Sequence, residues 1–414
     1  MGDTTLSRRG FLRAGGATAA GAAVLGVAGC GGGSGSGKTT LTWWDYLSGS
    51  AARALEQQLK RYEELHPGVS IQRRAVPFEQ FKQTLLRGAS AGELPDIVLI
   101  DNPDHQSFAE LGILEDLTAR VSTWGQADAY FDGPWRSTMW EGKNYGIPDA
   151  SDCLTLWFNE EVLRSAGLDP PGNWDELNAA ARELTDNDRY GFAVSAIKSE
   201  EGTFQWLPFL WQTGADLANI AGEGGQAALG LWVDMVQKGW MSQGILNWDQ
   251  EAVKDEFANG KAAMMVNGPW QIPVLKEEAP NLKWNVVPLP KQEQEASILG
   301  GENRAIIKGS PNVDLAWDLL TWSQKPDVLK EYLTTAALLT SRQDIAEDTH
   351  WSGDPILSTF VEQLRVARPR AYGPKYPEMS SAIQVAIQAA VSGQSSVTDA
   401  LNQTQQKITP LLPK

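Results

Sequence analysis

The sequence contains few residues that form disulfides or bind metals. It has two cysteines, Cys30 and Cys153, in 414 residues, which excludes a disulfide-rich scaffold. Its three histidines, His66, His105 and His350, lie far apart and show no metal-ligand spacing. We therefore expect no disulfide framework, no metal site and no cofactor.

Long hydrophobic runs are also missing. The apolar N-terminal segment 17–28 is interrupted by glycine and is shorter than the about 20 residues that a membrane-spanning helix needs. It lies between the adjacent arginines Arg8 and Arg9 and the sequence Val27-Ala28-Gly29-Cys30, a pattern typical of a twin-arginine lipoprotein signal. The sequence predicts a signal peptide over residues 1–30, a lipid on Cys30 and a Gly/Ser tether over 31–38. We expect an exported lipoprotein, anchored to the outer face of the cytoplasmic membrane.

Positive charge is scarce relative to negative charge. Thirty-five Lys and Arg residues face 51 Asp and Glu residues, which gives a net charge of −16. Without the three arginines and one aspartate of residues 1–29, the remaining chain carries 32 − 50 = −18. Such a body repels phosphate backbones and anionic headgroups, so nucleic acid is excluded as a partner. The charge alone does not select a cationic ligand, because it also serves solubility.

The body after the tether alternates strand-like and helix-like segments. The first five are residues 40–46, 51–65, 69–74, 78–89 and 96–100, in the order strand, helix, strand, helix, strand. This βαβαβ beginning predicts an α/β fold with a largely parallel sheet, helices on both faces and a ligand crevice at the C-terminal strand ends.

Later segments continue the alternation. Asn173 and Glu176 form a capping box that begins a helix. After Ala316 the chain is expected to be mostly helical, and no internal repeat is visible. Further strands are predicted at residues 154–158, 191–195, 261–267, 284–290 and 304–307. The length is too great for one such domain and suits two.

Several motifs stand in a fixed order along the chain. They are Leu41-Thr-Trp-Trp-Asp45, Leu94-Pro-Asp-Ile-Val-Leu-Ile-Asp101, Tyr145-Gly-Ile-Pro148, Leu156-Trp-Phe-Asn159, Gly260-Lys-Ala-Ala-Met-Met-Val-Asn-Gly-Pro-Trp270, Val286-Val-Pro-Leu-Pro290, Gly300-Gly-Glu-Asn303, Ala367-Arg-Pro-Arg370 and Tyr376-Pro-Glu. As an ordered set they resemble the extracellular solute-binding proteins of the maltose-binding type, which serve carbohydrate ABC importers.

The resemblance implies a two-lobed periplasmic-binding-protein fold with discontinuous lobes, a hinge and a central ligand cleft. Lobe 1 is expected to comprise residues 39–148 plus 290–323, and lobe 2 residues 149–289 plus 324–414. The implied partners are a small carbohydrate and the transmembrane subunits of an ABC importer, and the protein is expected to be a monomer.

Tryptophan and carboxylates together suit a sugar, because an indole stacks on the ring face while planar oxygens accept hydroxyl hydrogens. Among the 17 tryptophans, Trp270 follows Gly268-Pro269 at a predicted strand end, close to Asn267, and matches a ligand-stacking tryptophan of the family. Of Trp206 and Trp211, at most one is expected to reach the ligand. The alternative for each indole is packing in the core.

The remaining ligand candidates lie at strand ends or chain crossings. They are Trp44, Asp45, Asp101, Asn102, Asp149, Asp152, Gly300, Gly301, Glu302, Arg368 and Arg370. Trp43 and Trp44 cannot both face a crevice at the end of their strand, because strand side chains alternate. Several of these candidates have an alternative role that stays open. The alternatives are helix capping for Asp101 and the arginines, hinge hydrogen bonding for Asp149 and Asp152, and a plain turn for the glycines.

Three other functions compete with sugar capture. A secreted glycosidase needs a pair of carboxyls, and no local motif nominates one; Gly-x-Ser-x-Gly, His-Glu-x-x-His and a phosphate loop are missing as well. A binding protein for a cationic solute such as a polyamine would use the same tryptophan and carboxylate residues. An adhesion lipoprotein is disfavoured by the lack of repeats. The sequence therefore favours a sugar-binding protein that is not an enzyme.

Overall fold

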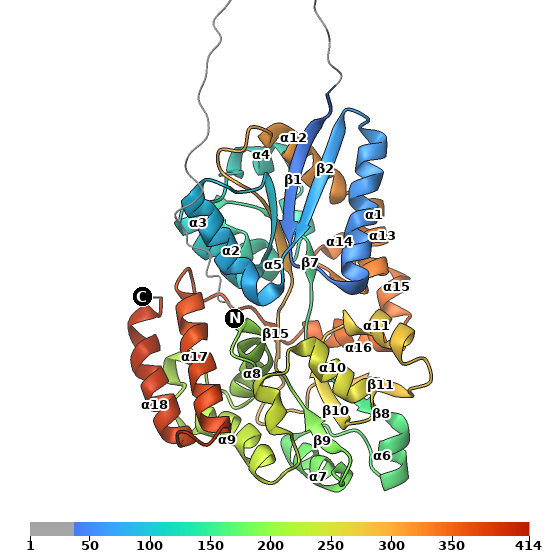
Figure 1. The fold of residues 1–414 in the computed structure, drawn as a ribbon, viewed down its shortest axis with the longest axis vertical. Coiled ribbons are helices and arrows are strands. Elements are labelled where there is room, and N and C mark those ends of the chain that lie inside the picture. The colour runs from blue at the N-terminus through green and yellow to red at the C-terminus, as the bar shows by residue number, and fades with distance from the viewer. Residues whose placement is uncertain (1–36, 414) are drawn as a thin grey trace, which may run out of the picture. The chain divides into compact units, whose positions relative to one another are not determined.

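The computed structural model of the protein describes residues 37–413 (Figure 1). Its first strand, β1 (Thr39–Asp45), shows the alternation that the sequence predicts. Leu41 and Trp43 are buried on one face, while Thr42 and Trp44 are half-buried on the other. The strand pairs in parallel with β2 (Val69–Ala75) and with β3 (Ile97–Asp101), which confirms the βαβαβ beginning.

The two larger sheets are mixed, which corrects the expectation of a largely parallel sheet. The described strands of the first sheet have the order β2-β1-β3-β13-β6, with β6 at Ile147–Pro148 and β13 at Glu302–Ile306. Those of the second have the order β11-β8-β10-β9, with β8 at Thr155–Asn159, β9 at Tyr190–Ala193, β10 at Ala262–Asn267 and β11 at Trp284–Val287.

One strand in each sheet is reversed, and the reason is the same in both. β13 runs antiparallel to both β3 and β6, and β8 runs antiparallel to both β10 and β11. Each reversed strand follows a crossing of the chain from the other sheet. It therefore starts at the end of the sheet where the neighbouring strands finish, and it runs in the opposite direction to them. Two short pairs accompany the crossings: β7 (Ala150–Ser151) with β14 (Leu339–Thr340), and β12 (Ser297–Ile298) with β15 (Ala367–Arg368).

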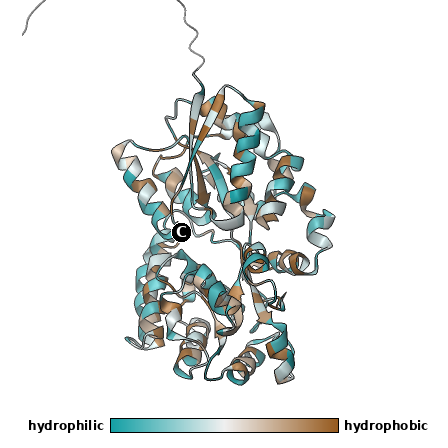
Figure 2. Ribbon diagram, turned by 45° about the vertical axis from the view of Figure 1, so that its right-hand side comes forward, coloured by the Kyte–Doolittle hydropathy of each residue, from teal (hydrophilic) through white to brown (hydrophobic). Residues whose placement is uncertain are grey.

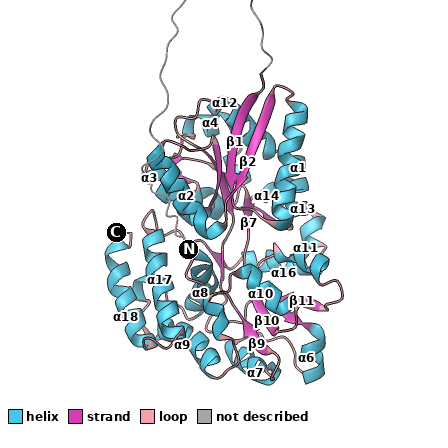
Figure 3. Ribbon diagram, viewed as in Figure 1, coloured by secondary structure: helices cyan, strands magenta, loops and turns pink. Residues whose placement is uncertain are grey.

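The helices cover the sheets, and the strands between them form two separate groups in Figure 3. The helices before the first crossing are α1 (Gly49–Leu65), α2 (Phe78–Ala91), α3 (Asn102–Glu110), α4 (Thr118–Trp124) and α5 (Asp132–Ser137). Those between the first two crossings are α6 (Glu160–Ala166), α7 (Trp174–Leu184), α8 (Glu200–Gln212), α9 (Glu223–Gln237), α10 (Gln250–Ala258) and α11 (Gln271–Glu278). The later ones are α12 (Val313–Ser323), α13 (Pro326–Ala336), α14 (Gln343–Ala346), α15 (Thr349–Ser352), α16 (Pro355–Leu364), α17 (Tyr376–Val391) and α18 (Val397–Ile408).

Helix α13 lies differently from the expected lobe division. The sequence assigns residues 324–414 to lobe 2, yet α13 packs against α1 beside the first sheet. Buried Leu329 and Tyr332 join the same core cluster as Leu41, and Arg61 of α1 forms an ion pair with Glu331 at 2.5 Å. We therefore propose that the last crossing comes after α13, because α13 packs against α1. The other lobe boundaries stay predictions.

Each face of the first sheet has its own hydrophobic core. Leu41 and Leu99 face a cluster that includes α1, whereas Val98 and Ile100 face a cluster with Phe81 of α2. A third cluster covers one face of the second sheet, whereas Trp157 and Met265 on the other face join the cluster that contains Leu41. Figure 2 shows apolar strands enclosed by helices whose outer faces are hydrophilic. The predicted N-cap at Asn173 is confirmed by its bond from the Glu176 amide, although the Glu176 carboxylate accepts from Gly172 rather than from Asn173.

Candidate ligand-binding site

A cavity of about 530 Å³ lies between the strand ends of the first sheet and the helices α8, α10 and α11. This volume is within the range of about 300–1,000 Å³ that small-molecule sites occupy. Tyr46 follows β1, Asp101 ends β3 and Glu302 begins β13. Because β13 is antiparallel to β3, Glu302 pairs with Asp101 at this edge. Strand ends from distant parts of the sequence thus bring polar side chains to one place.

The cavity lining is strongly acidic. Its carboxylate residues are Glu79, Asp101, Asp152, Glu200, Glu201, Asp249, Glu251, Glu278 and Glu302. Among the described residues that line it, the cationic side chain is that of Arg370. Aromatic rings from Tyr46, Phe78, Phe204 and Trp270 form other parts of the wall.

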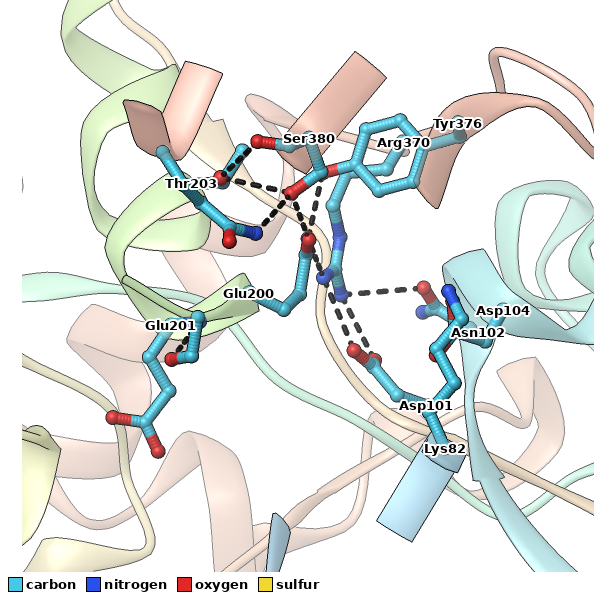
Figure 4. Close-up of polar contacts among 12 residues, drawn as sticks. Lys82, Asp101, Asn102, Asp104, Glu200, Glu201, Thr203, Arg370, Tyr376 and Ser380 are labelled. Atoms are coloured by element: carbon cyan, nitrogen blue, oxygen red, sulfur yellow. Dashed lines mark hydrogen bonds and ion pairs between the residues drawn. The ribbon is translucent and has the colours of Figure 1, made fainter. Parts of the chain in front are cut away.

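Arg370 joins the two sides of the cavity, as Figure 4 shows. Its guanidinium donates to both carboxylate oxygens of Asp101 at 3.0 and 3.2 Å, and to Oε1 of Glu200 at 2.7 Å. Asp101 belongs to the first sheet and Glu200 to the start of α8, so one buried cation holds both. The guanidinium also lies over the ring of Phe204 at 4.7 Å. Tyr376 and Ser380 of α17 donate to Glu200 and fix its position.

Asp152 and Glu302 line the cavity without an ion-pair partner among residues 37–413. Oδ1 of Asp152 and Oε2 of Glu302 have no hydrogen-bond partner among residues 37–413. Burial, reinforced by the charges of Asp101 and Asp149, raises the pKa of Asp152 to about 7. Burial and the Asp152 charge likewise hold the pKa of Glu302 well above its usual value. Both carboxyls therefore retain protons more readily than an exposed carboxyl does.

Trp270 stands at the N-cap position of α11, directly after Gly268-Pro269. The indole is half-buried, lines the cavity and packs against two of the core clusters. A Cβ atom on Gly268 would lie only 2.0–2.5 Å from three atoms of the indole ring. A residue without a side chain is therefore needed at position 268 to leave room for the ring.

Comparisons with known proteins identify the family. The bacterial extracellular solute-binding protein family matches the chain over residues 57–359. The chain belongs to this family. It is 24% identical to the maltotriose-binding protein of Pyrococcus abyssi, covering 85% of this chain and 77% of that protein.

Solved structures agree with the family membership. An ABC transporter solute-binding protein of Thermotoga lettingae bound with α-D-tagatose is 26% identical, with a TM-score of 0.85 over 91% of this chain and 100% of that one. The maltose-bound T. maritima MalE3 protein is 25% identical, with a TM-score of 0.83 over 90% and 100%. The expected two-lobed fold of the maltose-binding type is thereby confirmed.

The structure of this solute-binding protein brings half of the sequence-predicted residues to the cavity. These are Asp101, Asp152, Trp270, Gly300, Gly301, Glu302 and Arg370. Asp101 precedes α3 at its N-cap position, yet its side chain makes no cap bond and pairs with Arg370 instead. Gly301 adopts a positive φ of 119°, and a Cβ there would lie 2.1 Å from the carbonyl oxygen of Ala150. The glycine pair thus allows two crossing segments to approach closely.

The other predicted residues do not line the cavity. At the end of β1, Asp45 is buried and bound by Arg73 at 2.7 and 2.8 Å, while Trp44 lies under Arg74. Neither Trp43 nor Trp44 reaches the cavity, which corrects the expectation that one of them does; Trp43 is fully buried in the core.

Trp206, Asp149 and Asn267 are fully buried and serve the structure of the protein. Trp206 belongs to the core of the second sheet, as does Trp211, so neither indole lines the cavity. Asp149 forms a buried ion pair with Arg304 at 2.6 Å. Asn267 donates to the Gln250 carbonyl and accepts from the Gly268 amide, which shapes the strand end before Trp270.

Arg368 and Asn102 lie beside the cavity without lining it. Arg368 pairs with Asp216 at 2.6 Å and covers the ring of Trp211. Asn102 accepts from Arg370 at 3.4 Å. Neither arginine caps a helix, so the capping alternative for Arg368 and Arg370 is wrong in this structure.

Sequence reasoning missed Tyr46, Phe204, Glu200 and Glu201, all of which line the cavity. Tyr46 is the last residue of the predicted strand 40–46 and directly follows β1, so its place at a strand end was the signal that could have found it. Ser199 followed by two glutamates is a helix-start signal, and the Ser199 hydroxyl does accept from the Glu201 amide. That signal predicts the helix start without predicting that it faces the ligand.

The described residues contain no metal-binding group and no spanning helix. Residues 37–413 hold no cluster of three or more His, Cys, Asp or Glu side chains arranged for a metal ion. No helix in this range is both long and apolar enough to cross a bilayer. Cys153 is buried and unpaired. The predicted export arginines Arg8 and Arg9 and the lipidation site Cys30 lie outside the described residues.

Proposed function

We propose that this protein captures a sugar or oligosaccharide outside the cytoplasmic membrane and delivers it to an ABC importer. The observation that carries the proposal is the cavity between the two sheets. The Trp270 indole, several carboxylates and the Arg370 guanidinium all line this cavity. An indole stacks on the apolar face of a sugar ring, and the ionic side chains bond its hydroxyls. The maltotriose and tagatose ligands of related proteins support this class.

The protein acts by binding without turnover, as a lipid-anchored monomer. Family and fold are those of solute-binding proteins, which supports a role in capture. The lipid on Cys30 and the twin-arginine route are supported by the sequence pattern of residues 1–30. Incubation of the purified body with its tightest saccharide should produce no new reducing ends; turnover that disappears on replacing Glu302 or Asp152 would assign the protein to the enzymes.

A thermal-shift screen against neutral and charged saccharides tests the proposed ligand class. A specific ligand present at 100 times its Kd stabilises the folded state by about 2.7 kcal/mol, which raises the melting temperature measurably. Calorimetric titration of each hit then gives a 1:1 stoichiometry if one cavity binds one ligand. A screen in which no saccharide stabilises the protein, while another solute class does, would contradict sugar capture.

A second candidate, capture of a cationic solute such as a polyamine, is favoured by one specific observation. Nine carboxylates and one guanidinium line the cavity. The same screen therefore includes spermidine and putrescine, and binding of these linear amines without any saccharide would replace the first proposal.

A further inference from the structure

The charges of the cavity are compensated unevenly. Arg370 bonds Asp101 and Glu200, and the buried Lys254 contacts Glu278 at 2.5 Å. Asp249 caps α10 by accepting from the Ala252 amide. These acidic side chains already have partners before any ligand enters.

Asp152 and Glu302 have no such cation, and they lie together. The backbone of Asp152 pairs with Gly300 in both directions, at 2.9 and 3.2 Å, and Glu302 follows two residues later. Asp152 is 4% exposed, and its Oδ1 lacks a partner, as does Oε2 of Glu302, within the described chain. Within residues 37–413, the Glu302 carboxylate accepts one side-chain hydrogen bond, from the Tyr46 hydroxyl at 3.4 Å.

Two adjacent buried carboxyls without a counter-charge are costly to ionise. A buried charge is tolerated when it is paired and hydrogen-bonded, and otherwise the group keeps its proton. An ammonium group carries one positive charge and three N–H donors, so it can bond Asp152, Glu302 and a third oxygen at once. The phenol ring of Tyr46 and the ring of Phe204 line the same cavity and add aromatic surface of the kind that attracts a cation.

We infer that the ligand of this cavity is an amino sugar, or an oligosaccharide that contains one, whose ammonium group binds between Asp152 and Glu302. This inference rests on the proposed function and names its substrate class. Glu201 and Asp249 also lack an ion pair, but they accept from the backbone amides of Gln250 and Ala252. The cavity carboxyls with a buried oxygen that has no partner among residues 37–413 are Asp152 and Glu302, and their position at the Gly300–Glu302 segment suits one ammonium on a larger polar body. A linear polyamine presents amines at several separated points, whereas the Trp270 wall provides a flat surface for a sugar ring.

The test uses the wild-type protein and saccharide pairs that differ only by an ammonium in place of one or two hydroxyls. The pairs are glucose and glucosamine, galactose and galactosamine, mannose and mannosamine, and cellobiose and its fully deacetylated diamino counterpart. Calorimetry at pH 7 should show at least one amine-bearing member binding about tenfold or more tighter than its neutral partner, because charge-assisted hydrogen bonds are about twice as strong as neutral ones.

Two isosteric variants locate the ammonium. Asp152→Asn and Glu302→Gln should each remove most of the preference within the pair, while the neutral member loses less than about threefold. Asp128→Asn removes one exposed carboxylate that does not line the cavity and should leave the preference unchanged. Thermal melts of the ligand-free variants establish whether each is folded. If a variant is not folded, the affinities of the saccharide pairs for the wild-type protein decide whether an ammonium group is preferred.

The outcomes separate the two proposals. If a neutral saccharide binds tightly and its amine partner binds no better, the inference of an amino sugar is overturned while sugar capture stands. If no amine-bearing saccharide binds at all, the inference is likewise overturned. If spermidine binds and no saccharide of either kind does, both proposals fail.

Discussion

Asp152 is a buried residue that titrates near neutral pH in the folded protein. Its pKa is raised to about 7, mainly by burial, whereas an aspartate in an unfolded chain titrates near 3.9. Between these two values the folded state binds more protons than the unfolded state. The contribution of Asp152 to stability is therefore greatest below about pH 4 and is lost as the pH rises to about 7.

Replacing Asp152 with asparagine removes this pH dependence. Relative to wild type, we expect Asp152→Asn to gain up to about 4 kcal/mol of unfolding free energy as the pH rises from about 4 to 8, because a pKa raised from 3.9 to about 7 costs wild type about 1.4 kcal/mol per unit and asparagine does not titrate. Denaturant melts of ligand-free protein across this range give the measurement. Asp128→Asn, which removes an exposed carboxylate, controls for net charge. A constant difference between wild type and Asp152→Asn at all pH values would contradict the assignment.

Trp270 is the aromatic residue that we expect to contribute most to binding. Trp270→Ala removes a half-buried indole from the cavity wall and should weaken affinity for the tightest ligand by roughly 2–4 kcal/mol, the range for a buried aromatic anchor. Trp240→Ala is the matched control, because that indole is also half-buried but does not line the cavity. Calorimetry measures the ligand affinity of wild type and of both variants, and thermal melts verify that the variants are folded. If Trp270→Ala binds the ligand as tightly as Trp240→Ala does, Trp270 lies outside the binding site.

At the scale of the element, the segment that carries Gly300 and Gly301 joins two chain crossings. Gly301 has a φ of 119° and approaches the Ala150 carbonyl so closely that a methyl group cannot fit. Gly309 also has a positive φ, of 83°, but no atom lies within 4 Å of its missing Cβ. Both glycines therefore have a positive φ, but they differ in their surroundings.

Alanine substitutions at Gly301 and Gly309 separate the free-energy cost of steric contact from the cost of backbone strain. Gly309→Ala should cost about 1 kcal/mol, since only the left-handed conformation is strained. Gly301→Ala should cost at least about 3 kcal/mol, because the contact with Ala150 must also be relieved. Chemical denaturation of both variants measures the difference. Similar losses of stability would show that the β7 and β13 segments separate easily.

The elements were more predictable than their pairing. Local periodicity predicted β1, α1 and α2 to within two residues at every boundary, because alternation and helical stripes are encoded within each segment. The strands β8 and β13 were predicted, but their reversed direction was not, since it depends on where the chain crosses between sheets. The position of α13 was missed for the same reason, because its contact with α1 joins segments far apart in sequence.

The cavity was predictable only where strand ends mark it. Asp101 and Glu302 lie at such ends and were found. Asp149 and Asp152 stand three residues apart at one crossing, yet one is locked to Arg304 and the other faces the cavity. Distinguishing them requires knowing the long-range partner of each carboxylate, and that information is spread over the whole fold.

At the scale of the whole molecule, the proposed export and lipid anchoring would depend on residues 1–30. We expect Arg8→Lys combined with Arg9→Lys to block export, because we propose that the adjacent arginines are the export signal. Cys30→Ser should leave the body exported but without lipid, so that it appears in the soluble extracytoplasmic fraction. Fractionation with metabolic labelling of lipid checks both. Normal export of the double-lysine variant would show that another route is used.

The ion pairs of Arg370 connect the two lobes across the cavity. Asp101 comes from the first sheet and Glu200 from α8 beside the second, and both bind the same guanidinium at 2.7–3.2 Å. In a two-lobed binding protein the ligand is held when the lobes close around it. Losing part of a buried, hydrogen-bonded charge pair acts chiefly on dissociation.

Asp101→Asn keeps the shape of the side chain and removes its charge, so Arg370 retains Glu200 as its anionic partner. We expect the ligand to dissociate about 10- to 100-fold faster, with a much smaller change in the association rate. Stopped-flow tryptophan fluorescence measures both rates. Asp314→Asn is the control, because its ion pair with Arg120 is exposed and such pairs contribute little. If dissociation from Asp101→Asn is as slow as from wild type, the ion pair between Arg370 and Asp101 stabilises the ligand-free protein and does not slow ligand release. Closure of the lobes then depends on contacts with the ligand itself.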